Sequence, residues 1–113
     1  MANTLEILKA GSKRLSLPGE TVTTTFYGDF SIADLFGKDA VKDTFENAFN
    51  SWKHDYRYLT NLVVTLNYKS WEHDENGNDT LAELYVELFE KASGYASENL
   101  KGEELDYYFN VTD

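Results

Sequence analysis

Apolar side chains recur every three or four positions along several stretches of this chain, which is the spacing that places them on one face of an α-helix. The clearest example predicts a helix over 79–99, and Asn78 or Asp79 can cap its first turn by accepting an unpaired backbone N–H. Its apolar stripe consists of Leu81, Leu84, Tyr85, Leu88, Ala92, Tyr95 and Ala96. This stripe must pack against a partner, whereas the glutamates beside it should stay in water or meet a basic surface.

The same spacing predicts helices at 30–36 and 39–54, with Gly37 ending the first in the left-handed conformation. The pattern at 57–73 fits both a helix and an alternating strand. We interpret it as a helix, because it is long, contains no glycine or proline, and has no evident partner strand. A final short helix or strand follows at 103–110. Its predicted docking residues are Leu105, Tyr108 and Phe109.

The segment before these helices has a different composition. Pro18-Gly19 is a turn signal, and the β-branched and aromatic residues of 21–27 favour an extended chain, so a small hairpin is expected.

The expected fold is therefore a single mainly α domain over 1–113, with an irregular or hairpin segment at 1–28 and a body of four to five helices at 29–113. An α+β fold with 57–70 as a strand is the alternative. The predicted core residues are Phe30, Ile32, Phe36, Val41, Phe45, Phe49, Trp52, Leu59, Leu62, Val63, Leu66, Leu84, Leu88 and Tyr95. Two or three of the remaining aromatic rings can serve as anchors for a protein partner.

The net charge of −10 is concentrated at one end of the chain. Residues 1–71 carry eight acids and eight bases, whereas 72–113 carry twelve acids and two bases. Such a field repels nucleic acid and anionic membranes and attracts basic surfaces.

We therefore predict an acidic surface that binds a basic protein, including a DNA- or RNA-binding one. Its residues are Glu72, Asp74, Glu75, Asp79, Glu83, Glu87, Glu90, Glu98, Glu103, Glu104 and Asp106. On a helix, Glu83 and Glu87 are spaced much like adjacent phosphates of a DNA strand, so a DNA mimic is the sharpest version. The alternative is a soluble helical domain whose acids serve only solubility.

Residues 72–83 also approach the pattern of a calcium-binding loop, with Gly77 at the sixth position. The oxygen ligands would be Glu72, Asp74, Asn76, Asn78, Thr80 and Glu83. Glu at the first position and Asp79 at the normally apolar eighth position depart from that pattern. A calcium- or metal-binding helical module is a second hypothesis, and a small hydrolase acting through His73 and nearby carboxylates is a third.

Other chemistry is poorly represented. The absence of cysteine excludes disulfides and thiolate catalysis, and no G-x-S-x-G elbow or Gly-rich phosphate loop occurs. We expect a non-enzymatic protein without a cofactor. No secretory signal or membrane-spanning run is visible, so we expect a cytoplasmic location.

Several motifs resemble small uncharacterised proteins of phages and conjugative elements of Gram-positive bacteria. They are Thr24-Thr25-Phe26, DFSIADLFG at 29–37, KDTFENAFNSWK at 42–53, YLTNLVVTLN at 58–67, ELY at 83–85 and ENLKGEELDYYF at 98–109. Together they cover most of the chain beyond residue 20, while residues 1–20 match nothing in that group. The resemblance implies a mobile-element accessory protein with a mostly helical fold, and it brings no catalytic residues.

Overall fold

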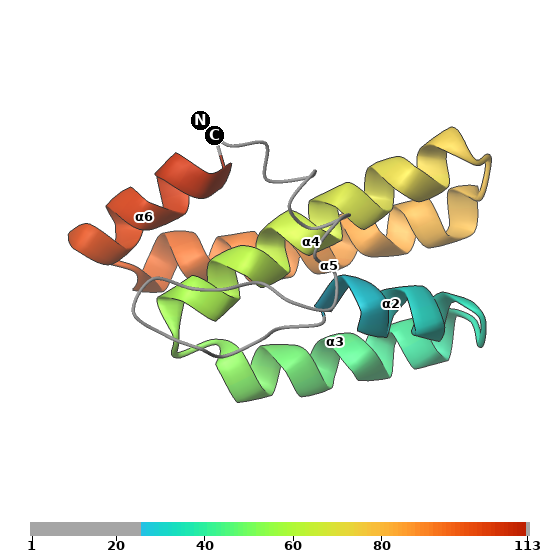
Figure 1. The fold of residues 1–113 in the computed structure, drawn as a ribbon, viewed down its shortest axis with the longest axis horizontal. Coiled ribbons are helices and arrows are strands. Elements are labelled where there is room, and N and C mark those ends of the chain that lie inside the picture. The colour runs from blue at the N-terminus through green and yellow to red at the C-terminus, as the bar shows by residue number, and fades with distance from the viewer. Residues whose placement is uncertain (1–25, 113) are drawn as a thin grey trace.

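The computed structural model describes residues 26–112, and all regular secondary structure in this part of the chain is helical (Figure 1). The elements are α2 (Phe26–Asp34), α3 (Lys38–Trp52), α4 (Tyr56–Glu75), α5 (Asp79–Asn99) and α6 (Glu103–Thr112). The mainly α prediction is confirmed, and the ambiguous segment at 57–70 is helix. The predicted hairpin around Pro18-Gly19 lies outside the described residues.

Helix α4 is the centre of the fold. It packs antiparallel against α5 along most of its length, and it also contacts α2, α3 and α6 (Figure 1). Its buried residues therefore occur on several sides of the helix, from Tyr58 to His73. This explains why its sequence lacks a single clean stripe and fits two periodicities.

Local signals set the helix boundaries. Gly37 has φ of 103°, a value that favours glycine, and it separates α2 from α3. The side chain of Asp55 accepts a hydrogen bond from Arg57 N at the start of α4. Asn78 accepts one from Leu81 N at the start of α5, as predicted. Gly77, with φ of 78°, completes the tight turn between these two helices.

Most of the predicted core is confirmed as buried, whereas Tyr95 is half-buried. The buried residues are Phe30, Val41, Phe45, Phe49, Leu59, Leu62, Val63, Leu66, Leu84 and Leu88. Three assignments were wrong: Ile32, Phe36 and Trp52 are exposed by 60%, 77% and 36%. Helix α2 buries a side other than the one that carries Ile32, Phe36 follows the end of that helix, and Trp52 is the last residue of α3, so the core covers none of the three fully.

The start of the helical body was also placed too late. Phe26 and Tyr27 belong to α2 and not to an extended segment. Phe26 is buried in the core, and its burial stabilises this first turn. At the other end, Tyr108 of α6 is buried and Leu105 is partly buried, but Phe109 is exposed. None of the helices in 26–112 combines the length and the apolar character that a membrane span requires.

Candidate functional site

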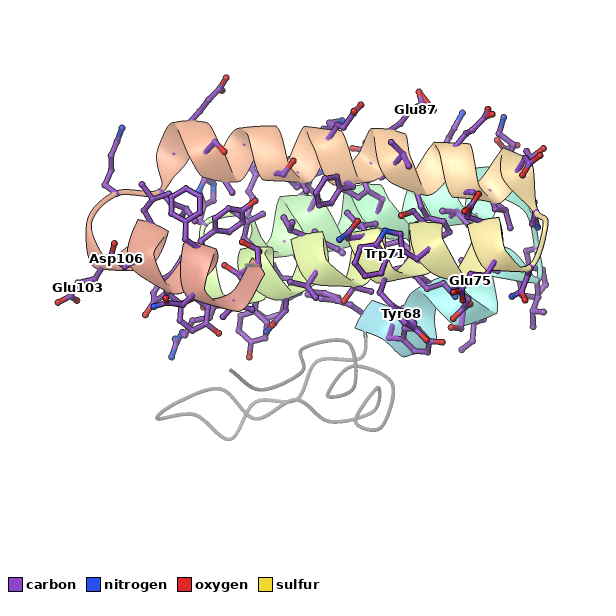
Figure 2. All side chains as sticks on the ribbon, turned by 90° about the horizontal axis from the view of Figure 1, so that it is seen from above. Tyr68, Trp71, Glu75, Glu87, Glu103 and Asp106 are labelled. Atoms are coloured by element: carbon purple, nitrogen blue, oxygen red, sulfur yellow. The ribbon has the colours of Figure 1, made fainter. Side chains whose placement is uncertain are left out.

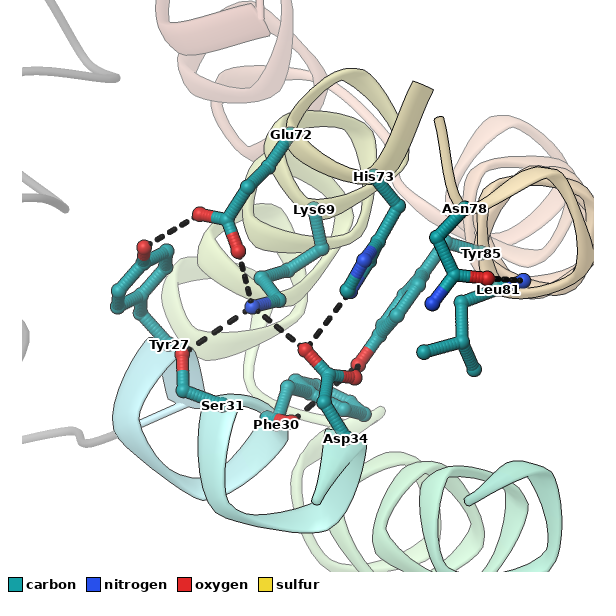
Figure 3. Close-up of polar contacts among 10 residues, drawn as sticks. All are labelled: Tyr27, Phe30, Ser31, Asp34, Lys69, Glu72, His73, Asn78, Leu81 and Tyr85. Atoms are coloured by element: carbon teal, nitrogen blue, oxygen red, sulfur yellow. Dashed lines mark hydrogen bonds and ion pairs between the residues drawn. The ribbon is translucent and has the colours of Figure 1, made fainter. Parts of the chain in front are cut away.

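A lysine is buried at the junction of α2 and α4. Lys69 is 1% exposed, and its ammonium lies 2.8 Å from Asp34 Oδ2 and 2.8 Å from Glu72 Oε2 (Figure 3). It also donates to Ser31 Oγ at 3.1 Å and lies over the ring of Tyr27 at 4.9 Å. Two carboxylates, a hydroxyl and an aromatic face thus replace the water that a buried ammonium loses.

Glu72 bridges the two helices through its second oxygen. Tyr27 on α2 donates its hydroxyl to Glu72 Oε1 at 2.6 Å. Burial alone would raise the Glu72 pKa, but the hydrogen bonds from Lys69 and Tyr27 outweigh it and lower that pKa below its ordinary value. Burial, and then the bond to Glu72, raise the Tyr27 pKa.

Asp34 connects the same lysine to α5. Its Oδ2 also lies 2.7 Å from His73 Nε2, and Tyr85 of α5 donates its hydroxyl to Oδ1 at 2.5 Å. The rings of His73 and Tyr85 stack with centroids 5.4 Å apart. Burial raises the Tyr85 pKa, and the hydrogen bond to Asp34 raises it further. The carboxylate of Asp34 therefore fixes α2 to both long helices.

We call this set the ionic cluster; it comprises Tyr27, Ser31, Asp34, Lys69, Glu72, His73 and Tyr85. Asp34, Glu72 and His73 bring ligand atoms within 4.8 Å of one another, and they are the only such convergent set of metal-ligating residues in 26–112. However, Lys69 already contacts both carboxylates, so a cation is built into the cluster. The geometry fits a structural connection between helices better than a metal site.

Most residues of the predicted calcium loop are helical in this structure. Helix α4 continues to Glu75, so Glu72 and Asp74 are helical and only Asn76, Gly77 and Asn78 connect the helices. Glu72 is bound to Lys69 and Tyr27, while Asn78 caps α5. A twelve-residue loop that wraps its oxygens around an ion would require these helical residues to unwind.

The hydrolase hypothesis also meets an obstacle. His73 is buried by Asp34 and by the Tyr85 ring, and it lines neither of the two surface grooves described below. The other histidine, His54, is exposed in the connection between α3 and α4, with its Nδ1 3.5 Å from Tyr95 Oη. A substrate would therefore have to displace packed side chains before it reached the His73 imidazole.

The eleven predicted acidic residues fall into separate groups. Glu72 belongs to the ionic cluster and is therefore not part of the exposed acidic surface. The other ten residues are exposed. Five of them lie on α5, within an arc of about 100° at 100° per residue, and extend over roughly 28 Å. We call them the acidic face of α5: Asp79, Glu83, Glu87, Glu90 and Glu98. None forms an ion pair with another residue of 26–112.

The remaining acids lie elsewhere. Figure 2 shows Glu87 pointing away from α4, with Glu75 near one end of the helix pair and Glu103 and Asp106 near the other. Glu103, Glu104 and Asp106 occupy the first turn of α6, where negative charge is favourable to the helix dipole. The acids therefore do not form a single continuous row, and α5 carries the longest exposed set.

A groove of about 500 Å³ runs between α4 and α5 beside this acidic face. Trp71 of α4 lies in it, half-exposed at 50%, and Val86 of α5 faces it, exposed by 43%. Figure 2 shows Trp71 on α4, on the side of the pair that faces the viewer. The other residues that line the groove are Asn67, Ser70, Asp74, Ala82, Glu83, Phe89 and Glu90. An apolar floor thus has carboxylates on both sides and no lysine or arginine.

A second groove of about 400 Å³ lies between α2 and α3. It is lined by Phe26, Asp29, Ile32, Thr44, Asn47, Ala48, Ser51 and Trp52. Its rim carries less negative charge than the α4–α5 groove, and the predicted acidic residues are absent from it.

Sequence reasoning missed Lys69 and Trp71. Leu62, Leu66, Lys69 and His73 continue one stripe at steps of three and four, so the polar pair at its end was a signal for a buried ionic contact. Trp71 carries no comparable signal in the sequence. Its exposure depends on where α5 lies.

Comparison with protein-family models, curated proteins and solved structures finds no match. The function is therefore inferred from the arrangement of the chain's own residues.

Proposed function

We propose that this protein is a non-enzymatic binding protein that engages a basic protein through the acidic face of α5. Five exposed carboxylates on one side of a 21-residue helix, without ion partners among residues 26–112, are the observation that carries the proposal. Because i and i+4 side chains lie about 6 Å apart, these charges repel one another until a basic surface neutralises them.

The contrast with the other ionic residues supports this assignment. Asp34 and Glu72 are held by Lys69, and Glu46 is held by Lys91 at 3.3 Å. These lysines compensate acids of α2, α3 and α4, but not the acidic face of α5. Complementary charge accelerates association and favours the correct partner, with an affinity that decreases as salt increases.

The sharpest form of the proposal is an accessory protein of a phage or other mobile element that acts as a DNA mimic in anti-restriction or anti-defence. The resemblance of the helical motifs to mobile-element proteins supports the origin. The spacing of Glu83 and Glu87 supports competition with DNA for a basic binding groove.

Affinity capture with matched variants tests the proposal. The immobilised protein is exposed to a lysate of a Gram-positive host, and retained proteins are eluted with increasing salt and identified. We expect a nucleic-acid-binding protein that is released by salt and displaced by duplex DNA. The triple variant E83Q/E87Q/E90Q should lose it, whereas E103Q/E104Q/D106N, which removes the same charge from α6, should retain it.

Equal loss with both triple variants would mean that overall charge, and not the acidic face of α5, controls retention. Absence of any retained nucleic-acid-binding protein at low salt would contradict the proposal itself. Circular dichroism of each variant verifies that the helices remain folded.

A further inference from the structure

We infer that the α4–α5 groove binds an amphipathic basic helix from the partner protein. This inference rests on the proposed function, because it assigns a site and a partner chemistry to the same acidic surface. Trp71 is half-exposed although it is among the largest apolar side chains of the helical body. Trp71 lies beside Val86, so two exposed apolar groups share one concave surface.

The rim of the groove specifies the charge of the occupant. Asp74 of α4 lies on one side, and Glu83 and Glu90 of α5 lie on the other, with no basic lining residue. A basic occupant would place its cations against these carboxylates and its apolar side chains against Trp71. Partly desolvated aromatic anchors surrounded by a polar rim are typical of residues that dominate binding energy. The same carboxylates would repel a phosphate backbone or an anionic lipid surface.

The backbone of the groove specifies a helical occupant. Both walls are α-helices, and residues 26–112 contain no strand edge to which an extended peptide could add. An occupant on an apolar floor must then satisfy its own backbone groups, which a helix does. The groove extends over 67–74 on α4 and 82–90 on α5, roughly 10–12 Å, or about two helical turns. A third helix seated between α4 and α5 would complete this side of the bundle.

The test uses the full-length protein and a fluorescently labelled 18-residue alanine-rich peptide with a leucine stripe at helical spacing and lysines beside it. Two control peptides replace the lysines by glutamates or the leucines by serines. Anisotropy titrations should show binding of the first peptide only, at low salt. Trp71→Ala should weaken it about 30-fold, the loss typical of a central aromatic anchor. Phe109→Ala, which removes an aromatic ring of similar exposure from α6, should change binding less than about twofold.

A charge-matched pair of variants distinguishes the contribution of the groove to peptide binding from that of the acidic surface as a whole. E83Q/E90Q should weaken the peptide at least about tenfold, whereas E103Q/E104Q should have little effect. Val86→Lys, at an exposed helical position that tolerates lysine, should also prevent binding, and it replaces Trp71→Ala if that variant loses helicity on circular dichroism.

The outcomes distinguish this inference from the proposed function. Equal binding of the leucine and serine peptides, with no effect of Trp71→Ala or Val86→Lys, would overturn the assignment of the groove as the binding site. The acidic face of α5 would remain as a binding surface. Failure of the leucine–lysine peptide to bind at all would also overturn this assignment. The proposed function fails separately, when affinity capture retains no nucleic-acid-binding protein.

Discussion

The acids of α2 and α4 and the acids of α5 are chemically alike, yet their surroundings are opposite. Asp34 and Glu72 are enclosed with Lys69 and accept hydrogen bonds from two tyrosines. On α5, Glu83 and Glu87 stand in water without a cation from residues 26–112. The first pair holds helices together, whereas the second leaves charge available for another molecule. Residue type alone therefore does not assign a role; the environment does.

Removal of the internal cation should have the largest effect. Lys69→Met leaves Asp34 and Glu72 close together and partly buried without a positive charge, so we expect a loss of about 3–5 kcal/mol in the free energy of unfolding. Urea denaturation followed by circular dichroism measures it. Lys91→Met is the matched control, because the Lys91–Glu46 pair is exposed and should contribute about 0–1 kcal/mol. Equal losses in the two variants would contradict a special role for the ionic cluster.

The tyrosine that connects α5 to the cluster should come next. Tyr85→Phe removes the donor to Asp34 Oδ1 and leaves that oxygen buried, at an expected cost of about 1–3 kcal/mol in stability. Tyr95→Phe removes a hydroxyl whose only described hydrogen-bond partner is the exposed His54, and should cost less than about 0.5 kcal/mol. A smaller loss for Tyr85→Phe than for Tyr95→Phe would argue against Asp34 as the link to α5. Thermal melting of both variants provides the comparison.

Stability should decrease at both ends of the pH range because of this cluster. The Glu72 pKa is lowered on folding from its ordinary 4.5, so the stabilisation that it provides is present above that pH and is lost as the pH falls below it. The Tyr27 and Tyr85 pKa values are raised from 10.0, so their contribution is present below that pH and is lost as the pH rises above it. Unfolding curves across this pH range measure the loss of stability at acid pH and at alkaline pH, which form the acid and alkaline limbs of the profile.

Two variants sharpen the pH prediction. Glu72→Gln should flatten the acid limb and leave the alkaline limb, whereas Tyr85→Phe should flatten part of the alkaline limb only. An unchanged acid limb in Glu72→Gln would mean that other carboxylates carry it.

The smallest effect is expected on the acidic face of α5, and it should have the opposite sign. Glu87→Gln relieves repulsion from Glu83 one turn away, so it should raise the free energy of unfolding by about 0.2–0.5 kcal/mol at low salt. The gain should disappear as salt increases. Glu72→Gln, by contrast, should destabilise the protein under the same conditions. Stabilisation by both changes would remove the distinction between the two kinds of acid.

Periodicity predicted the helices well where one side of a helix is buried. Helix α5 has a single apolar stripe, and its predicted and observed bounds agree. Helix α4 was ambiguous because it is covered from several directions, so both apolar and polar positions are buried. The identity of a residue also does not show which side of a short helix faces the core, which is why Ile32 and Phe36 were misplaced.

The ionic cluster and the groove depend on contacts between distant parts of the chain. Lys69 meets Asp34 across 35 positions, and Tyr85 meets the same carboxylate across 51. Helical spacing relates only near neighbours, so it cannot select one lysine from eight or one tyrosine from eight. Trp71 likewise becomes a groove residue only when α5 is placed beside it.

Because Lys69 is enclosed, its chemical reactivity reports whether α2 and α4 are in contact. Its side chain is 1% exposed, whereas Lys91 and Lys101 lie at the surface. An acylating reagent should modify surface amines quickly and reach the enclosed one only when α2 separates from α4. Peptide mapping of a labelling time course would then report how often these two helices part in the native protein.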